Sequence, residues 1–520
     1  MSACVSIPAA FRSAVQAYAD APLVVTPDAQ YSFTQIDVAS DAIAAALSAA
    51  AIGQGERVAL YCPNVVEFVI SYLGVVKAGA VVVPVNLLIQ PAEIRYVLED
   101  ADVRGVIYHA ALAEKVAAVR SQLSAGDLYW ICIGEGVVES TDVGFESLLS
   151  RNLSLPAPDI DPMRDLAAIL YTSGTTGHPK GAMLSHHNLV SNTRSVKSAL
   201  QLRTGEDRLL VVLPMFHSFA ATVGLLTPAL HGLSLVPVIR FDPGLVSESI
   251  GRTGATVFLG VPSMYNLILH LAEERFRQWK SVRFGVAGGA AMPVELLRGF
   301  EQRFGFPVVE GDGPTECSPV TCVNPLEGER KPGSVGLPVP DVEFAILDDT
   351  GAPLPGGEIG EICVRGPNVM QGYWNLPEAT AETFAGDWLR TGDLGYIDAD
   401  GYIFMVDRKK DMVIVNGMNV YPRMVEEVLY QHPDILEAAV VGEPHDSHGE
   451  IVVAHVVGRE GVDLDDRELK SFCREQLGQH QMPRRFVMHE SLPKNATGKI
   501  LKRELRRAGE VERGIVPGRG

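Results

Sequence analysis

The sequence has few positive charges and no long apolar run. Its 520 residues include 44 lysines and arginines against 63 aspartates and glutamates, a formal net charge of −19. That balance argues against general binding to nucleic acid or to an anionic membrane surface. No stretch reaches the ~20 consecutive apolar residues of a membrane span, and Met1-Ser-Ala-Cys4 does not begin a signal peptide. We therefore expect a cytoplasmic protein with no integral membrane segment.

Cysteine is scarce and follows no pattern. The seven cysteines are scattered through the chain, and Cys317 and Cys322 have no second pair that would complete a zinc site. An odd number without regular spacing is typical of free thiols in a reducing compartment. A disulfide framework and a structural zinc are both disfavoured.

The apolar pattern predicts an α/β protein of more than one domain. The chain is too long for one compact core. Short apolar strands at Val58–Cys62 and Ala80–Val85 flank a helical pattern over Val65–Ala78, which indicates a parallel βαβ unit. After about residue 330, dense Gly and Pro with short alternating strands indicate a small antiparallel barrel or sheet.

A charged run, Asp407-Arg-Lys-Lys-Asp411, separates this region from a last α+β segment. Helices are predicted there over Val425–Gln431 and Asp466–Leu477, with strands near Ile435–Val441 and Ile451–Val457. Few apolar contacts can cross such a run, so it fits a hinge between domains. An ordinary exposed turn fits its composition equally well.

The most informative stretch is Tyr171-Thr-Ser-Gly-Thr-Thr-Gly-His-Pro-Lys180-Gly181. It directly follows the apolar run Leu166–Tyr171, which predicts a buried strand. Its glycines let backbone N–H groups approach an oxyanion, and its hydroxyls and Lys180 suit phosphate. The spacing is not that of a Walker A loop, and Pro179 disfavours a helix starting beneath the phosphates. The stretch predicts a loop that holds the polyphosphate of a nucleotide.

Two further stretches follow predicted strands. In Leu213-Pro-Met-Phe-His217-Ser-Phe219, His217 is a candidate catalytic residue, although a structural histidine is common in such a place. In Val309-Glu-Gly-Asp-Gly-Pro-Thr-Glu316, the glycines permit a flat approach by a base, and Glu316 offers a hard oxygen ligand for magnesium. Glu316 stands where a dinucleotide fingerprint needs its third glycine. A solvated turn is the alternative for the second stretch.

The last two stretches each present one charged residue at a glycine turn. Trp388-Leu-Arg-Thr-Gly-Asp393 presents a carboxylate that suits two ribose hydroxyls. Leu492-Pro-Lys-Asn-Ala-Thr-Gly-Lys499-Ile500 presents Lys499 beside an apolar residue, where most lysines are merely solvated. Together and in this order, the stretches resemble the adenylate-forming superfamily of acyl-CoA synthetases, peptide-synthetase adenylation domains and luciferases. The resemblance runs from about residue 30 to 508, nearly the whole chain.

The resemblance implies a fold, an activity and site residues. It implies an α/β N-terminal domain, residues 1–406, of two parallel-rich sheets and a small β-barrel, then a hinge at 407–411 and a small mobile α+β domain at 412–520. It implies that ATP and Mg²⁺ activate a carboxylic acid as acyl-AMP, and that coenzyme A then accepts the acyl group. The implied phosphate-binding residues are Thr172, Ser173, Gly174, Thr175, Thr176, Gly177 and Lys180. Thr172 and Glu316 would lie near the magnesium.

The remaining nucleotide contacts follow from the same resemblance. Gly288, Gly289, Ala290, Gly311, Asp312 and Thr315 would surround the base, and Asp393 and Arg408 would hold the ribose. Lys499 would be the catalytic lysine, with His217, Thr172 and Glu316 in the catalytic set. Lys410 would be the pivot, and Gly417 would lie on the face that replaces the Lys499 loop. Asp312 departs from the family, which commonly has Tyr or Trp there, so stacking on the base would be reduced.

The acid itself is predicted to be apolar. Phe219, Val223, Val261 and the loop 288–290 would line its pocket. Peptide-synthetase relatives have an Asp at the position of His217, and its absence argues against an amino-acid substrate. The stretch Val415–Glu426 is most similar to fatty-acid CoA ligases, which favours a medium- or long-chain fatty acid. An aryl acid such as a coumarate or benzoate is the alternative, as is loading of an acyl-carrier protein instead of CoA.

Two other classes remain open. A luciferase-like oxygenase would also adenylate an acid, and a non-catalytic binding module would share the fold. Intact Lys499, Glu316 and Asp393 disfavour the module. The basic run Lys494–Arg507 suits either the 3′-phosphate of CoA, an anionic lipid surface or a solvated helix face. We expect a monomer or homodimer without a nucleic-acid partner.

Overall fold

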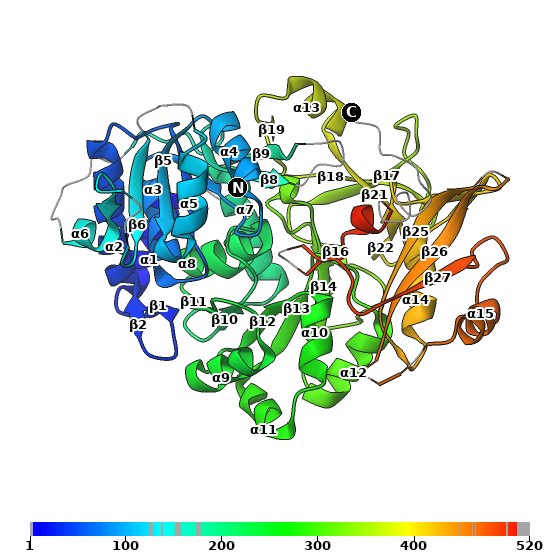
Figure 1. Ribbon diagram of the computed structural model, residues 1–520. Helices are drawn as coiled ribbons and strands as arrows, with labels where there is room; N and C mark the ends of the chain where they lie inside the picture. The colour runs from blue at the N-terminus through cyan, green and yellow to red at the C-terminus, as the bar shows by residue number, and fades with distance from the viewer. Residues whose placement is uncertain are drawn as a thin grey trace.

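The residues that the structure describes form four β-sheets with helices packed between and around them (Figure 1). The computed structural model describes residues 4–123, 128–136, 139–150, 158–172, 178–445, 447–459, 461–462, 464–495 and 498–506. Two large sheets hold most of the first 340 residues, and the strands of the last segment stand on the opposite side, orange in Figure 1. This α/β architecture confirms the predicted fold class.

The first large sheet has its strands in the order β16-β15-β14-β13-β12-β10-β11-β1-β2. The five central strands β11, β10, β12, β13 and β14 are parallel. Their carboxyl ends therefore meet at one edge, where loops from distant parts of the sequence gather. The strands are β1 (Pro22–Val25), β2 (Gln30–Ser32), β10 (Arg208–Val211), β11 (Ser234–Pro237), β12 (Val257–Gly260), β13 (Phe284–Ala287), β14 (Val308–Asp312), β15 (Cys322–Val323) and β16 (Leu337–Pro338).

The second large sheet has the order β19-β9-β8-β4-β3-β5-β6-β7. Its parallel part includes the predicted βαβ unit, in which β3 pairs with β4. Strands β8 and β9 form an antiparallel pair with Thr172 opposite Lys180, so a strand and not a helix follows the predicted phosphate loop. The strands are β3 (Arg57–Tyr61), β4 (Val81–Pro84), β5 (Val103–His109), β6 (Tyr129–Ile133), β7 (Val143–Gly144), β8 (Leu166–Thr172), β9 (Lys180–Ser185) and β19 (Gly372–Tyr373).

The third sheet is antiparallel, as predicted after residue 330. It consists of β17 (Glu343–Leu347), β18 (Gly360–Arg365), β20 (Phe384–Ala385), β21 (Trp388–Ile397) and β22 (Ile403–Arg408). Predicted strand Trp388–Arg390 is therefore only the beginning of β21. Asp407 and Arg408, assigned to the hinge from sequence, continue β22 and pair with Leu394 and Asp393.

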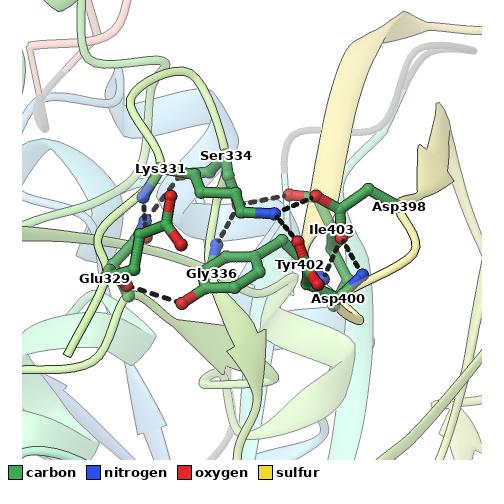
Figure 2. A network of polar contacts seen from close by, with 9 residues as sticks. Glu329, Lys331, Ser334, Gly336, Asp398, Asp400, Tyr402 and Ile403 are labelled. Atoms are coloured by element: carbon green, nitrogen blue, oxygen red, sulfur yellow. Dashed lines mark hydrogen bonds and ion pairs between the residues drawn. The ribbon is translucent and has the colours of Figure 1, made fainter.

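A polar network ties the loop before β16 to the hairpin formed by β21 and β22 (Figure 2). Lys331 Nζ lies 2.6 Å from Asp398 and 2.5 Å from Asp400, and 4.6 Å from the centre of the Tyr402 ring. The Tyr402 hydroxyl donates to the Glu329 carbonyl at 2.5 Å. Ser334 Oγ donates to the Ile403 carbonyl and accepts from Gly336 N–H. We call these contacts the Lys331 clamp; they join the third sheet to the first.

The last segment has its own sheet and its own apolar core. The strands are β23 (Val413–Val415), β24 (Met418–Val420), β25 (Ile435–His445), β26 (Gly449–Gly458) and β27 (Arg485–His489). Buried side chains from Val413 to Phe486 form a cluster separate from the large core of the N-terminal half. The predicted helices and strands of this segment are present, although β25 and β26 extend beyond the predicted ranges.

Fifteen α-helices of the described chain complete the fold. They are α1 (Ile7–Tyr18), α2 (Phe33–Ala49), α3 (Val66–Lys77), α4 (Pro91–Asp100), α5 (Ala113–Arg120), α6 (Phe145–Leu149), α7 (His186–Ala199), α8 (Thr227–His231), α9 (Pro243–Thr253), α10 (Pro262–Leu269), α11 (Glu273–Phe276), α12 (Val294–Phe304), α13 (Pro377–Thr383), α14 (Pro422–Tyr430) and α15 (Asp466–Arg474). In the ranges described, none of them combines the length and apolarity that a membrane crossing requires. All seven cysteines are free thiols.

Candidate active site

Several loops of the first sheet meet where its parallel strands end. His217 follows β10, Gly288 and Gly289 follow β13, and Gly311 and Asp312 close β14. The backbones come very close here: a Cβ on Gly313 would lie 1.6 Å from the Pro319 carbonyl oxygen. Only glycine fits such an approach. The sheet edge thus brings residues from three separate parts of the sequence together, and we call this edge the platform.

Lys499 reaches this platform from the last segment. Its loop is a tight turn in which Asn495 N–H donates to the Lys499 carbonyl and Lys499 N–H donates to Asn495 Oδ1, each at 2.9 Å. Gly498 takes a φ of +80° there. Ser263, at the start of α10, donates to the Gly498 carbonyl at 3.5 Å. Asn266 of the same helix donates to the Leu436 carbonyl at 3.4 Å. Helix α10 is therefore the surface on which the last segment docks with its lysine at the site.

Acidic and basic groups alternate around the Lys499 ammonium. Burial lowers the pKa of Lys499 to about 8, Arg408 and Lys410 act in the same direction, and Asp393 and Asp312 oppose them. Arg408 Nε lies 3.1 Å from Asp393 Oδ1, because β21 and β22 place these two residues opposite each other. Burial raises the pKa of Asp393 to about 6 and also raises that of Asp312. Two acids, Asp312 and Asp393, thus lie among three basic groups at this point of the site.

The pH dependence of acid activation follows from this cluster. The predicted catalytic role of Lys499 requires its cationic form, so on that prediction kcat/KM for ATP should fall as pH rises through about 8. Asp312→Asn removes a neighbouring negative charge, and we expect the alkaline fall to move about one pH unit lower. The measurement is a pH profile of ATP–pyrophosphate exchange. An unchanged alkaline limb in the Asn variant would show that Asp312 does not act on Lys499.

The phosphate end of the site lies between β8, β9 and β19. Thr172 ends β8, and its hydroxyl donates to the Lys180 carbonyl at 3.4 Å. Ser173, Gly174, Thr175, Thr176 and Gly177 lie outside the described residues, so their predicted roles stay predictions. The Lys180 ammonium lies 5.0 Å from the centre of the Tyr373 ring, and the Tyr373 hydroxyl donates to Glu316 Oε1 at 2.7 Å.

An apolar cavity of about 550 Å³, partly open to solvent, adjoins the platform. Val196 and Ala199 of helix α7, with Leu200 directly after it, form part of its wall. Phe219 and Val223, which are predicted to contact the acid, also line this cavity. His217 and Asp312 are polar groups in its lining. Burial and Lys499 lower the pKa of His217 to about 4. His217 is therefore neutral, and since its Nδ1 accepts from Phe219 N–H at 3.3 Å, the ring proton is on Nε2.

Several predicted site residues lie outside the lining of this cavity. Val261 is not in the cavity lining; it lies beside the lysine loop, where a Cβ on Gly498 would be 3.2 Å from Val261 Cγ2. Ala290 also falls outside that lining, although Gly288 and Gly289 are in it. Gly417 sits at the exposed tip of the β23–β24 hairpin, and Lys410 is exposed in the turn after β22. Thr315 is bound to Ser218 by a 3.2 Å hydroxyl contact.

Sequence reasoning missed Tyr373 and the α7 wall. Tyr373 belongs to a two-residue strand that reaches Lys180 only through pairing with β9, far back in the sequence. Val196, Ala199 and Leu200 belong to an amphipathic helix whose pattern does not reveal which cavity it borders. The basic run is also clearer in three dimensions, since Lys494, Lys502 and Arg506 pair with Glu437, Glu426 and Asp411. These ion pairs favour a structural role for the three residues over binding of CoA or of an anionic lipid surface.

Comparison with known proteins identifies the same architecture over the whole chain. The family model described as AMP-binding enzyme matches residues 11–374, and that described as AMP-binding enzyme C-terminal domain matches residues 424–499. A long-chain-fatty-acid–CoA ligase of Bacillus subtilis (strain 168) is 38% identical, covering 90% of this chain and 89% of the relative. A sulfoacetate–CoA ligase of Cupriavidus necator is 37% identical, covering 94% of each.

Solved structures agree with these matches. The anthranilate CoA ligase AuaEII in complex with anthranoyl-AMP superimposes with a TM-score of 0.92 at 29% identity, covering 98% of each chain. The predictions of an adenylate-forming fold and of an AMP-forming enzyme of the acyl-CoA synthetase class are confirmed. The chain belongs to the AMP-binding enzyme family.

Proposed function

We propose that the protein joins a medium- or long-chain fatty acid to coenzyme A through an acyl-AMP intermediate. The observation that carries the choice of acid is the cavity beside the platform, whose wall of Val, Leu, Ala and Phe side chains suits an alkyl chain. Burial of such a chain contributes about 0.8 kcal/mol per CH₂ group. The similarity to a long-chain-fatty-acid–CoA ligase supports the same choice.

The cavity disfavours acids that bear a second negative group. No described residue of its lining is Lys or Arg, and the one charged residue in it, Asp312, is acidic. A buried anion without a paired cation is costly. The second negative group of a sulfonated or dicarboxylic acid would be buried in this cavity without a paired cation. The sulfoacetate–CoA ligase relative is therefore a weaker guide to the substrate. An uncharged aromatic ring avoids it, and the anthranilate CoA ligase structure makes an aryl acid the second candidate.

In the first half-reaction, a carboxylate oxygen attacks the α-phosphorus of ATP and the bond to the β-phosphate oxygen breaks, releasing pyrophosphate. Like charges approach each other in this step. Lys499 faces both Asp393 and Asp312 and would place its ammonium between the carboxylate and the α-phosphate. Asp393 and Arg408 would hold the ribose hydroxyls, and Lys180 the outer phosphates. Positioned donors of this kind stabilise developing negative charge without reorganisation.

Mg²⁺ fits the phosphate end. Mg²⁺ usually keeps several waters and binds through one or two carboxylates plus substrate phosphates. The described residues hold no group of three or more potential His, Cys, Asp or Glu ligands. Glu316 offers one carboxylate there, with Thr172 nearby as a hydroxyl ligand. The ion would neutralise phosphate charge when ATP is bound.

In the second half-reaction, the CoA thiolate attacks the acyl carbon and AMP leaves. Lys499 occupies the docked position on α10, so the last segment must turn to open the thiol's path. Its separate core and its few polar contacts to α10 support movement as one body. The turn at Lys409–Asp411 would absorb the rotation, and Gly417 would lie on the incoming face.

A panel of acids tests the proposal. Purified protein with ATP, Mg²⁺ and CoA is assayed for acyl-CoA by mass spectrometry with fatty acids of increasing length, benzoate and coumarate, malonate, and sulfoacetate. We expect kcat/KM to rise with chain length over part of the fatty-acid series, because each added CH₂ is worth about 0.8 kcal/mol or roughly fourfold. Higher kcat/KM for benzoate or coumarate would support the aryl candidate. Activity confined to malonate or sulfoacetate would contradict both.

A further inference from the structure

We propose that Tyr373 is a positioning residue that holds Glu316 and Lys180 in their relative places and leaves one Glu316 oxygen for the metal. The inference rests on the proposed function, since it takes Glu316 as the magnesium ligand and Lys180 as the phosphate cation. Tyr373 contacts both through different parts of its side chain, one through the hydroxyl and the other through the ring face.

The hydroxyl sets the orientation of the Glu316 carboxylate. It donates to Oε1 at 2.7 Å, a distance typical of a hydrogen bond to a charged acceptor. With Oε1 engaged, the remaining oxygen of Glu316 is the one available to a cation. Metal ligands are commonly oriented by such partners.

The ring face supports the Lys180 ammonium. Lys180 Nζ lies 5.0 Å from the ring centre, within the range of a cation–π contact. This contact holds the ammonium on the same side of the site as Glu316 before any phosphate is bound. A preorganised cation loses less conformational entropy when the ligand arrives.

The backbone fixes Tyr373 against both partners. Strand β19 pairs with β9, with Tyr373 opposite Ala182, and Trp374 N–H donates to the Gly181 carbonyl at 2.8 Å. On the other side, Met370 N–H donates to the Glu316 carbonyl at 2.8 Å. Tyr373 N–H itself donates to Thr380 Oγ1 at 2.9 Å. The segment is therefore hydrogen-bonded to β9, which begins at Lys180, and to the turn that contains Glu316. Tyr373 is held between these two residues.

Two substitutions separate the two parts of the side chain. Tyr373→Phe removes the hydrogen bond to Glu316 and keeps the ring beneath Lys180. Tyr373→Leu removes both. Binding is measured directly: Mn²⁺ titrations followed by electron paramagnetic resonance in the presence of an α,β-methylene analogue of ATP, and calorimetric titrations of ATP in EDTA. We expect the Phe variant to bind Mn²⁺ about tenfold more weakly and to bind metal-free ATP as the wild type does. The Leu variant should lose affinity in both titrations.

Tyr402→Phe is the matched control. It also removes a tyrosine hydroxyl hydrogen bond, but one to the Glu329 carbonyl in the Lys331 clamp (Figure 2) and not one to Glu316. Its Mn²⁺ affinity should equal that of the wild type. Wild-type Mn²⁺ affinity in Tyr373→Phe would overturn the inference, as would an equal loss in Tyr402→Phe. If the wild type binds metal-free ATP but no Mn²⁺, the magnesium site proposed above fails and this inference with it, whereas ligase activity is judged separately from the acid panel.

Discussion

Lys499→Ala should slow acyl-adenylate formation by about 10²–10³-fold, the loss that follows removal of one oxyanion donor. The neutral residue would leave Asp312 and Asp393 facing the incoming carboxylate and phosphates with Arg408 as their main cation. Formation of the thioester from supplied acyl-AMP should change far less, because the lysine loop leaves the site for that step. Single-turnover assays of the two half-reactions measure both effects.

Lys494→Ala is the control for this prediction. Lys494 lies in the same loop but pairs with Glu437 of the last segment and does not face the cluster around Asp393. Its loss should change either half-reaction little, because a partly exposed ion pair contributes only about 0.2–1 kcal/mol. An equal loss in both half-reactions for Lys499→Ala would mean that the lysine acts on folding or on binding common to both steps.

Gly313→Ala should reduce acyl-adenylate formation by about 10²-fold, since misplacing a site by 1 Å can have that effect. The added methyl would lie 1.6 Å from the Pro319 carbonyl oxygen and 2.6 Å from its carbon, both backbone atoms. No rotamer change relieves such a contact, so the 313–319 turn must shift and move Thr315 and Glu316. The unfolding temperature should fall as well, because overpacking costs about 1–3 kcal/mol.

Gly144→Ala controls for the substitution itself. A Cβ there meets nothing within 4 Å, and the backbone is in an ordinary conformation with φ of −69°. Activity and unfolding temperature, followed by pyrophosphate exchange and circular dichroism, should match the wild type. Wild-type activity in Gly313→Ala would show that the platform tolerates movement and that its close packing is not needed for catalysis.

Much of the fold could be predicted because several strands of the two large sheets are short, mostly apolar runs between polar turns. Leu166–Tyr171 and Val103–Tyr108 appear almost as predicted, as β8 and β5. The ends of β21 and β22 could not be predicted. Asp393, Asp407 and Arg408 are charged residues, which in sequence are typical of a loop. Backbone pairing across the hairpin keeps them in strands, and the ion pair between Asp393 and Arg408 offsets part of the cost of burying them. The composition around each residue does not reveal its partner on the other strand.

In the candidate site, too, some residues could be predicted from the sequence and others could not. Lys499, Asp393, Glu316 and Lys180 could be predicted as site residues because each stands close to a glycine in the sequence, where a charged side chain has no evident packing role. Tyr373 and Ala199 were not found, because an aromatic after glycine and an alanine in a helix are ordinary core residues in sequence. Their significance arises only from what the sheets place beside them. The role of Val261 stays a prediction, because it lies between Gly289, which lines the cavity, and Gly498 of the lysine loop.

The Lys331 clamp has a consequence for the fate of a labile product. By joining the β21–β22 hairpin to the loop before β16, it keeps Asp393 on the same rigid body as Gly311 and the apolar cavity. On the proposed mechanism, the last segment turns away with Lys499 while Asp393 would still hold the ribose of the acyl-AMP and the cavity its acyl chain. A mixed anhydride that water hydrolyses would then stay bound between the two half-reactions.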